Sequence, residues 1–301
     1  MSFQELDKCM LCGRKCGAQR NKGRAGRCGM TDHVVAARAA LHMWEEPCLS
    51  GEKGSGAVFF SGCPLQCVFC QNRPIALGKA GKEISVQRLA DIFLELRDQG
   101  ANNINLVTPT HFVPQIIEAV RRARTAGLSI PIVYNTGSYE NPETISMLEG
   151  TADIFLPDLK FRDPEIAERY AGAPDYFETA CRAIGEMVRI AGEPEFNSDG
   201  ILQKGVIVRH MILPGHTKDS EDIIRYLHER YGSRIFISIM NQYTPMEGIG
   251  KDYPELARKV TKREYDKVLS YAIDLGVENA YYQNGGTAKE SFIPAFDGEG
   301  I

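Results

Sequence analysis

The stretch GAVFFSGCPLQCVFCQN (residues 56–72) joins a short apolar run to three cysteines, Cys63, Cys67 and Cys70. Its first part, GAVFFSG (56–62), has the length and composition of a buried strand. Thiolates bind soft metals, and three of them can hold a four-iron cluster in which one iron has no protein ligand. The spacing C-x3-C-x2-C favours such a cluster over the alternative, a zinc site completed by a distant residue, because structural zinc prefers paired C-x2-C units.

Beyond this stretch, apolar strands alternate regularly with helices. Strands are predicted at 103–109, 131–137, 152–158, 204–213, 234–240 and 278–284, and helices at 85–100, 114–127, 141–150, 175–192, 220–232 and 261–276. Apolar strands separated by helices predict a parallel sheet covered on its faces, hence a doubly wound sheet or a full or partial barrel. In each architecture polar residues at the carboxyl ends of the strands line the active site.

The composition limits the classes of protein. The 301 residues are 43% hydrophobic, which suits one large domain with a small appendage, and the formal net charge of -4 excludes the overall basic field of a dedicated nucleic-acid binder. The chain has no run of eighteen apolar residues and no signal peptide at MSFQELDKCMLC (1–12), so we expect a cytoplasmic protein. Nine cysteines in the cytosol indicate metal binding rather than disulfides, with Cys48 and Cys181 as isolated buried thiols.

Residues 1–50 are cysteine-rich and weakly periodic, so we expect a small metal-binding module there and a core domain over 51–301. The spacing C-x2-C-x3-C-x11-C suits a second metal site, for which iron–sulfur is slightly favoured over zinc and over a metal-free loop. A basic patch in the same segment has two interpretations, an RNA-binding surface or solvated charge. The cysteines are Cys9, Cys12, Cys16 and Cys28, and the basic residues are Arg14, Lys15, Arg20, Lys22, Arg24 and Arg27.

The three-cysteine loop, with Phe69 before its last cysteine, resembles the signature loop of radical S-adenosylmethionine (SAM) enzymes. The similarity extends over most of the chain and narrows to the PflX-like branch of the relatives of pyruvate formate-lyase activating enzymes. This resemblance implies a partial (β/α)6 barrel related to the TIM barrel. It rests on HMWEEPCLSGEKGSGAVFFSGCPLQCVFCQN (42–72), NLVTPTHFVPQI (105–116), FLPDLKF (155–161), MNQYTPM (240–246) and GGTAKESFIPAFDGEGI (285–301).

The resemblance also implies residues that bind SAM. Activating enzymes usually have Gly-Gly-Glu after the second strand, where this chain has Thr108, Thr110 and His111, so a hydroxyl, a backbone carbonyl or the histidine must replace the glutamate. His111 has an alternative role in capping the next helix. The other positions implied are Asn135 with Thr136, Asp158, Lys160 and Arg209, with a surface ion pair as the alternative for Asp158 and Lys160 and a buried ion pair for Arg209. Weaker cavity candidates are Asn241, Gln242, Tyr243, Tyr281, Tyr282, Gln283 and Asn284.

The expected function follows from the resemblance. SAM chelates the open iron of a [4Fe-4S] cluster, a reduced flavodoxin-like or ferredoxin-like donor supplies an electron, and a 5′-deoxyadenosyl radical abstracts hydrogen from a substrate. The family suggests a glycine of a partner protein as the target, making the chain an oxidoreductase that activates a glycyl radical enzyme. The alternatives are radical modification of RNA or a small molecule, and a non-catalytic iron–sulfur or zinc protein.

Overall fold

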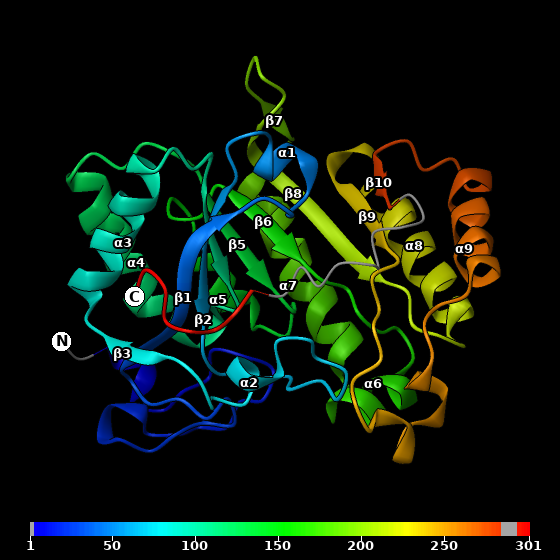
Figure 1. The fold of residues 1–301 in the computed structure, drawn as a ribbon, viewed down its shortest axis with the longest axis horizontal. Helices are drawn as coiled ribbons and strands as arrows, with labels where there is room; N and C mark the ends of the chain where they lie inside the picture. The colour runs from blue at the N-terminus through cyan, green and yellow to red at the C-terminus, as the bar shows by residue number, and fades with distance from the viewer. Residues whose placement is uncertain (1–2, 284–293) are drawn as a thin grey trace.

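The computed structural model describes residues 3–283 and 294–301. At its centre is one curved sheet with the strand order β10-β9-β8-β6-β5-β4-β2-β1-β3 (Figure 1). From β2 to β10 neighbouring strands are parallel and follow chain order, without the reversal of a doubly wound sheet, so the sheet is a partial barrel. The parallel strands are β2 (Ser55–Phe60), β4 (Ile104–Val107), β5 (Ile132–Thr136), β6 (Ile154–Pro157), β8 (Leu202–Met211), β9 (Phe236–Met240) and β10 (Ala280–Tyr282).

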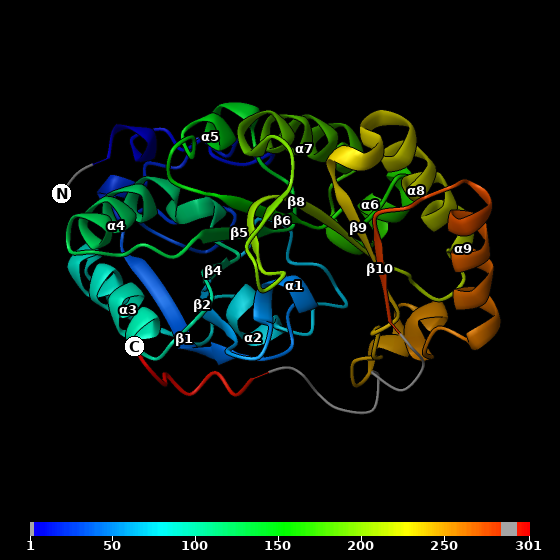
Figure 2. The same ribbon diagram turned by 90° about the horizontal axis from the view of Figure 1, so that it is seen from above.

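The main helices run along the outer, convex side of this sheet (Figure 2). They are α3 (Val86–Asp98), α4 (Val113–Thr125), α5 (Pro142–Ser146), α7 (Tyr176–Ala191), α8 (Thr217–Tyr231) and α9 (Lys262–Asp274), and each overlaps a predicted helix. Ser85 caps α3, because its Oγ accepts a hydrogen bond from the Arg88 amide at 3.0 Å. None of the described helices has the length and apolar character needed to cross a membrane.

Several elements were not predicted. Strand β1 (Val34–His42) pairs antiparallel with β2 and so extends the main sheet, although its residues fall in the segment 1–50 that the sequence predicts as a small metal-binding module. The C-terminal residues support the other edge of β1, where the Ala39 amide donates to Glu299 O at 2.9 Å. The remaining unpredicted elements are α1 (Pro47–Ser50), α2 (Arg73–Ala76), β3 (Lys82–Ile84), α6 (Pro164–Ala171) and the short β7 (Glu195–Phe196).

The segment before β1 contains little regular structure. It has 3-10 turns at Gln4–Leu6 and Arg20–Lys22, and its own apolar cluster consists of Leu6, Cys9 and Leu11 with Phe3 packed against them. In Figure 1 this segment, drawn in dark blue, lies below the sheet on the side of α2. It therefore sits at the carboxyl ends of β2, β4 and β5, where the loops that follow these strands meet.

Candidate active site

A cavity of about 1340 Å³ opens at the carboxyl ends of the parallel strands. All three cysteines of the 62–72 loop line it, together with polar residues that end four other strands. This is the position that a parallel α/β fold gives to an active site. The predicted residues that line the cavity are Phe69, Thr108, Thr110, Asn135, Thr136, Asp158, Lys160 and Arg209.

The cysteine loop is held by backbone contacts on both sides. The Arg14 Nε donates to Pro64 O at 2.8 Å, and the Val68 amide donates to Tyr170 O at 2.9 Å. Phe69 is buried, and its ring packs edge-on against Tyr170 with centroids 6.1 Å apart. Burial raises the pKa of the Cys67 thiol to about 12, so this thiol keeps its proton until a metal displaces it.

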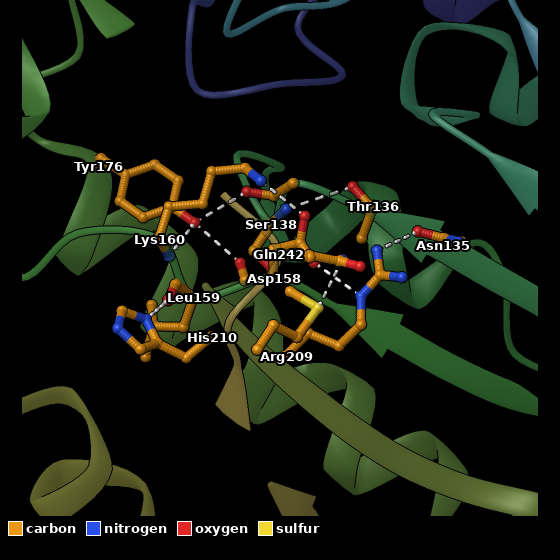
Figure 3. Close-up of polar contacts among 12 residues, drawn as sticks. Asn135, Thr136, Ser138, Asp158, Leu159, Lys160, Tyr176, Arg209, His210 and Gln242 are labelled. Atoms are coloured by element: carbon orange, nitrogen blue, oxygen red, sulfur yellow. Dashed lines mark hydrogen bonds and ion pairs between the residues drawn. The ribbon is translucent and has the colours of Figure 1, made fainter. Parts of the chain in front are cut away.

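A charged network lies on the opposite strands (Figure 3). Lys160 Nζ donates to Asp158 Oδ2 at 2.6 Å, and Arg209 Nε donates to Asp158 Oδ1 at 2.8 Å. Burial opposes the ionisation of Asp158, but the charges of Arg209 and Lys160 outweigh it and lower the pKa. The side chains of Lys160 and Asp158 are only 23% and 16% exposed, which contradicts the alternative of a solvated surface pair. Both side chains point toward the cavity, as expected for residues two apart in an extended segment.

Arg209 is fully engaged within the protein. Besides Asp158, its Nη2 donates to Asn135 Oδ1 at 2.8 Å, and its Nη1 lies 3.4 Å from Glu45 Oε2. The buried ion pair that the sequence left as an alternative is therefore present. Arg209 still lines the cavity, so the network fixes one wall of it.

Glu140 is the functional residue that sequence reasoning missed. This cavity-lining carboxyl is completely buried, and its Oε1 accepts hydrogen bonds from Thr110 Oγ1 at 2.6 Å and from Thr136 Oγ1. Its Oε2 has no hydrogen-bond partner among the described residues. Burial raises the pKa of Glu140 to about 7, while the two threonine hydroxyls lower it. A buried carboxyl thus lines the cavity from the loop after β5.

His111 does not take the predicted place. Its side chain is not among the cavity-lining residues; instead the ring Nε2 lies 2.6 Å from Ser61 O, behind the cysteine loop. Burial, and then the charge of Arg20, lower its pKa to about 3, so the ring is neutral. His111 therefore does not line the cavity with the other predicted residues, and its ring supports the chain that leads into the cysteine loop.

Backbone strain marks the same loops. Positive φ at non-glycine residues occurs, within the described residues, at Lys15, Gln66, Thr108 and Ser138. Gln66 lies in the cysteine loop, and Thr108 and Ser138 lie in the loops after β4 and β5. Such conformations cost on the order of 1–3 kcal/mol each and concentrate at functional sites. Lys15 has the same kind of strained backbone and lies in the N-terminal cysteine segment, between Cys12 and Cys16.

The weaker candidates divide between the cavity and the interior. Gln242, Tyr281, Tyr282 and Gln283 line the cavity, and Asn284 lies outside the described residues. Tyr243 is buried, and its hydroxyl donates to Leu256 O at 2.6 Å. The cavity rim also has apolar residues with large exposed fractions, namely Met43 at 44%, Trp44 at 62% and Tyr282 at 63%.

The N-terminal segment joins the loops of the cavity through direct contacts. The Gly13 amide donates to Tyr139 O at 2.9 Å, and Cys12 forms a β-bridge with Glu140. On the cysteine loop, Gln66 Nε2 donates to Arg27 O at 3.2 Å. This segment therefore forms part of the support of the active site.

Comparison with known proteins identifies the superfamily to which this architecture belongs. The family model of the radical SAM superfamily matches residues 57–227. An uncharacterized protein of Methanocaldococcus jannaschii is 28% identical over 91% of this chain and 76% of its own length. The PqqA peptide cyclase of Rhizobium meliloti is 24% identical over 41% of this chain.

For other matched proteins, the match covers half of their length or less. It covers 33% of the PqqA peptide cyclase. Among solved structures, SuiB of Streptococcus suis is 15% identical with a TM-score of 0.47, and the match covers 76% of this chain and 49% of SuiB.

Proposed function

The chain belongs to the radical SAM superfamily, and we propose that it cleaves SAM reductively at a [4Fe-4S] cluster held by Cys63, Cys67 and Cys70. The observation that carries this proposal is a loop of three buried or half-buried thiols that opens onto a cavity lined by polar strand ends. When bound, the cluster and SAM supply a 5′-deoxyadenosyl radical that abstracts hydrogen from a substrate. A reduced flavodoxin-like or ferredoxin-like protein is the proposed electron donor.

The residues present fit these groups. Cys63, Cys67 and Cys70 come from one loop and line one cavity, so their thiolates can share a metal centre there. Soft thiolates are the ligands that iron–sulfur clusters use. The unpartnered Glu140 Oε2 beside the cavity fits a cationic group such as the ammonium of SAM.

The remaining polar residues orient the cofactor. Lys160 and Asp158 would contact the polar parts of SAM, with Asp158 kept ionised by Arg209. Thr110 and Thr136 hold Glu140 in one orientation through its Oε1 and leave Oε2 for a ligand. Phe69 and the rings around it exclude water behind the loop, which protects a reactive radical from side reactions.

We propose a polypeptide as the substrate, with the Cα–H of a glycine in a partner protein as the specific target. The rim of the cavity exposes Met43, Trp44 and Tyr282, and aromatic residues and methionine are enriched at protein interfaces. The name of the relative in Rhizobium meliloti, a peptide cyclase, agrees with a peptide substrate.

RNA is a weaker substrate for this chain. Of the basic residues proposed for an RNA surface, Arg20 is buried and Arg14 donates to backbone carbonyls of the cysteine loop. The exposed remainder is Lys15, Lys22, Arg24 and Arg27. Of the six basic side chains in the proposed RNA-binding surface, these four are left to contact an RNA phosphate backbone.

Isotope transfer tests the substrate class. Anaerobically reconstituted protein is incubated with SAM, dithionite and either total protein from cells grown on Cα-deuterated glycine or uniformly deuterated RNA. We expect deuterium in 5′-deoxyadenosine only with the labelled protein, and none with a Cys67→Ala variant. Deuterium from the RNA alone would contradict the polypeptide proposal and leave the radical reaction in place.

A further inference from the structure

The N-terminal segment gathers four thiols that the radical reaction does not use. A Cβ placed on Gly26 would lie 3.3 Å from Cys16 Sγ and 3.5 Å from Cys28 Sγ, so these two thiols face the same point. Cys9 stands beside Arg20, whose Nη1 is 3.7 Å from its Sγ. Backbone hydrogen bonds fold Cys9 and Cys12 back toward the turn that contains Cys16, because the Gly17 amide donates to Cys9 O at 3.0 Å and the Lys15 amide donates to Cys12 O at 3.0 Å. The four cysteines of the C-x2-C-x3-C-x11-C pattern thus form one cluster.

The N-terminal segment has few apolar contacts of its own to hold it together. Its own apolar cluster has only Leu6, Cys9 and Leu11 with Phe3 packed on them, and all nine cysteines of the chain are free thiols. Small loop-rich segments that lack a core are usually held by disulfides or by a bound metal. With no disulfide available, the thiol cluster is the place where such a metal would act.

Arg20 supplies a second, independent observation. Its side chain is 0% exposed, and it donates to Met30 O at 3.1 Å, to Thr31 O at 3.0 Å and to His111 O at 2.5 Å. Among the described residues no carboxylate forms an ion pair with it. A guanidinium does not lose its proton in a protein, and a buried charge without a counter-charge is very costly.

Thiolates bound to a metal beside Arg20 would supply this counter-charge. Cys9 Sγ lies 3.7 Å from Arg20 Nη1, and buried thiolates persist when they bind a metal. Four thiolates around a metal centre carry the net negative charge that Arg20 lacks. Charge balance thus leads to a metal site without reference to the spacing of the cysteines.

The type of metal centre follows from the ligands and from the family. Four thiolates with the spacing C-x2-C-x3-C-x11-C suit an iron–sulfur cluster or a zinc ion. The chain belongs to the radical SAM superfamily, whose reaction uses electrons from an iron–sulfur cluster, and this favours iron–sulfur. We propose that Cys9, Cys12, Cys16 and Cys28 hold a second iron–sulfur cluster, closed by four protein thiolates and balanced in charge by Arg20.

Metal analysis of cysteine variants tests this site. The full chain is reconstituted anaerobically with iron and sulfide, and iron and zinc are measured per chain. We expect about eight irons in the wild type and about four in both Cys12→Ser/Cys16→Ser and Cys63→Ala/Cys67→Ala/Cys70→Ala, because each variant loses one four-iron cluster. A Cys181→Ser control, which changes an isolated thiol, should keep about eight.

Each other result overturns the proposal. Zinc that disappears in Cys12→Ser/Cys16→Ser while iron is unchanged would identify a zinc site, and unchanged iron and zinc would exclude a metal. The loop variant separates this test from the proposed function, since its remaining iron reports on the N-terminal site alone. It also replaces the Cys12→Ser/Cys16→Ser variant if that variant does not fold.

Arg20→Met tests the charge argument, because it keeps all four thiols. We expect it to retain about half of the wild-type iron, as Cys12→Ser/Cys16→Ser does, with an unchanged far-UV circular dichroism spectrum. Arg124→Met is the matched control, since Arg124 also donates to backbone carbonyls, those of Gly150 and Thr151, but contacts neither cysteine segment, and it should keep the full iron content. Full iron content in Arg20→Met would overturn the role of Arg20 as counter-charge.

Discussion

The chain has two cysteine sets with different surroundings. Cys63, Cys67 and Cys70 follow a buried strand and open onto a cavity lined by Glu140 and the Asp158 network. The N-terminal set lies in a segment with little regular structure, against a buried arginine and the outer side of the active-site loops. Three thiols beside a cavity leave room for a ligand, whereas four thiols beside a buried cation form a closed site.

The largest expected effect separates the two sets by chemistry. Cys67→Ala should abolish formation of 5′-deoxyadenosine from SAM and dithionite, because two thiols no longer hold the open cluster. The measurement is mass spectrometry of the nucleoside under anaerobic conditions. Cys181→Ser serves as the control and should keep wild-type activity. Wild-type product formation by Cys67→Ala would contradict the assignment of the loop.

Loss of the N-terminal set should reduce the same reaction without abolishing it. In Cys12→Ser/Cys16→Ser the contacts of this segment with Tyr139 and Glu140 loosen, so we expect SAM cleavage to fall by about 10–100-fold, as for other residues that support a site indirectly. The rate of 5′-deoxyadenosine formation measures it. A variant that loses iron but keeps the full rate would show that the two regions are not coupled.

Glu140→Gln tests the contribution of the loop after β5. The amide keeps the size of the side chain but removes the negative charge, so we expect the affinity for SAM to fall by roughly tenfold to a hundredfold, the value of a hydrogen bond to a charged group. Calorimetric titration with SAM measures the Kd. Glu143→Gln is the matched control because Glu143 is exposed on the following helix. Equal Kd values for both variants would exclude a role of Glu140 in binding.

The smallest expected effect concerns the contact between the two regions. Gly62 has φ +87°, and a Cβ there would lie 2.5 Å from Met30 Cγ and 2.8 Å from Cys28 O. Gly62→Ala should lower the free energy of unfolding by on the order of 1–3 kcal/mol more than Gly100→Ala, which has φ +91° but nothing within 4 Å. Chemical denaturation of both variants gives the difference. Equal losses would mean that the packing of Cys28 on the loop contributes little.

Much of the fold could be predicted because the parallel strands are buried apolar runs separated by capped helices. Strand β1 escaped prediction since VVAARAALH (34–42) is rich in alanine and its stability comes from pairing with β2 and the C-terminal residues. Such pairing joins segments far apart in the sequence. No pattern within residues 34–42 alone predicts this pairing.

Cavity-lining residues could be predicted next to strands, whose geometry sets the direction of each side chain. In the loops, where the backbone turns, the side-chain direction could not be predicted. Asp158 and Lys160 directly follow β6, where residues two apart in an extended segment point the same way. At Thr108 and Ser138 the backbone enters the left-handed region, which redirects the side chains that follow. For that reason His111 points behind the cysteine loop and Glu140 returns to the cavity, although Glu140 was visible in YNTGSYE (134–140).

The most direct test of the two-site account is electron paramagnetic resonance of the reduced protein with and without SAM. In Cys12→Ser/Cys16→Ser the remaining iron–sulfur signal should change when SAM is added, because the open cluster binds it. In Cys63→Ala/Cys67→Ala/Cys70→Ala the remaining signal should not respond to SAM. A SAM-dependent change in the second variant would contradict the account, because the N-terminal site would then have an open iron.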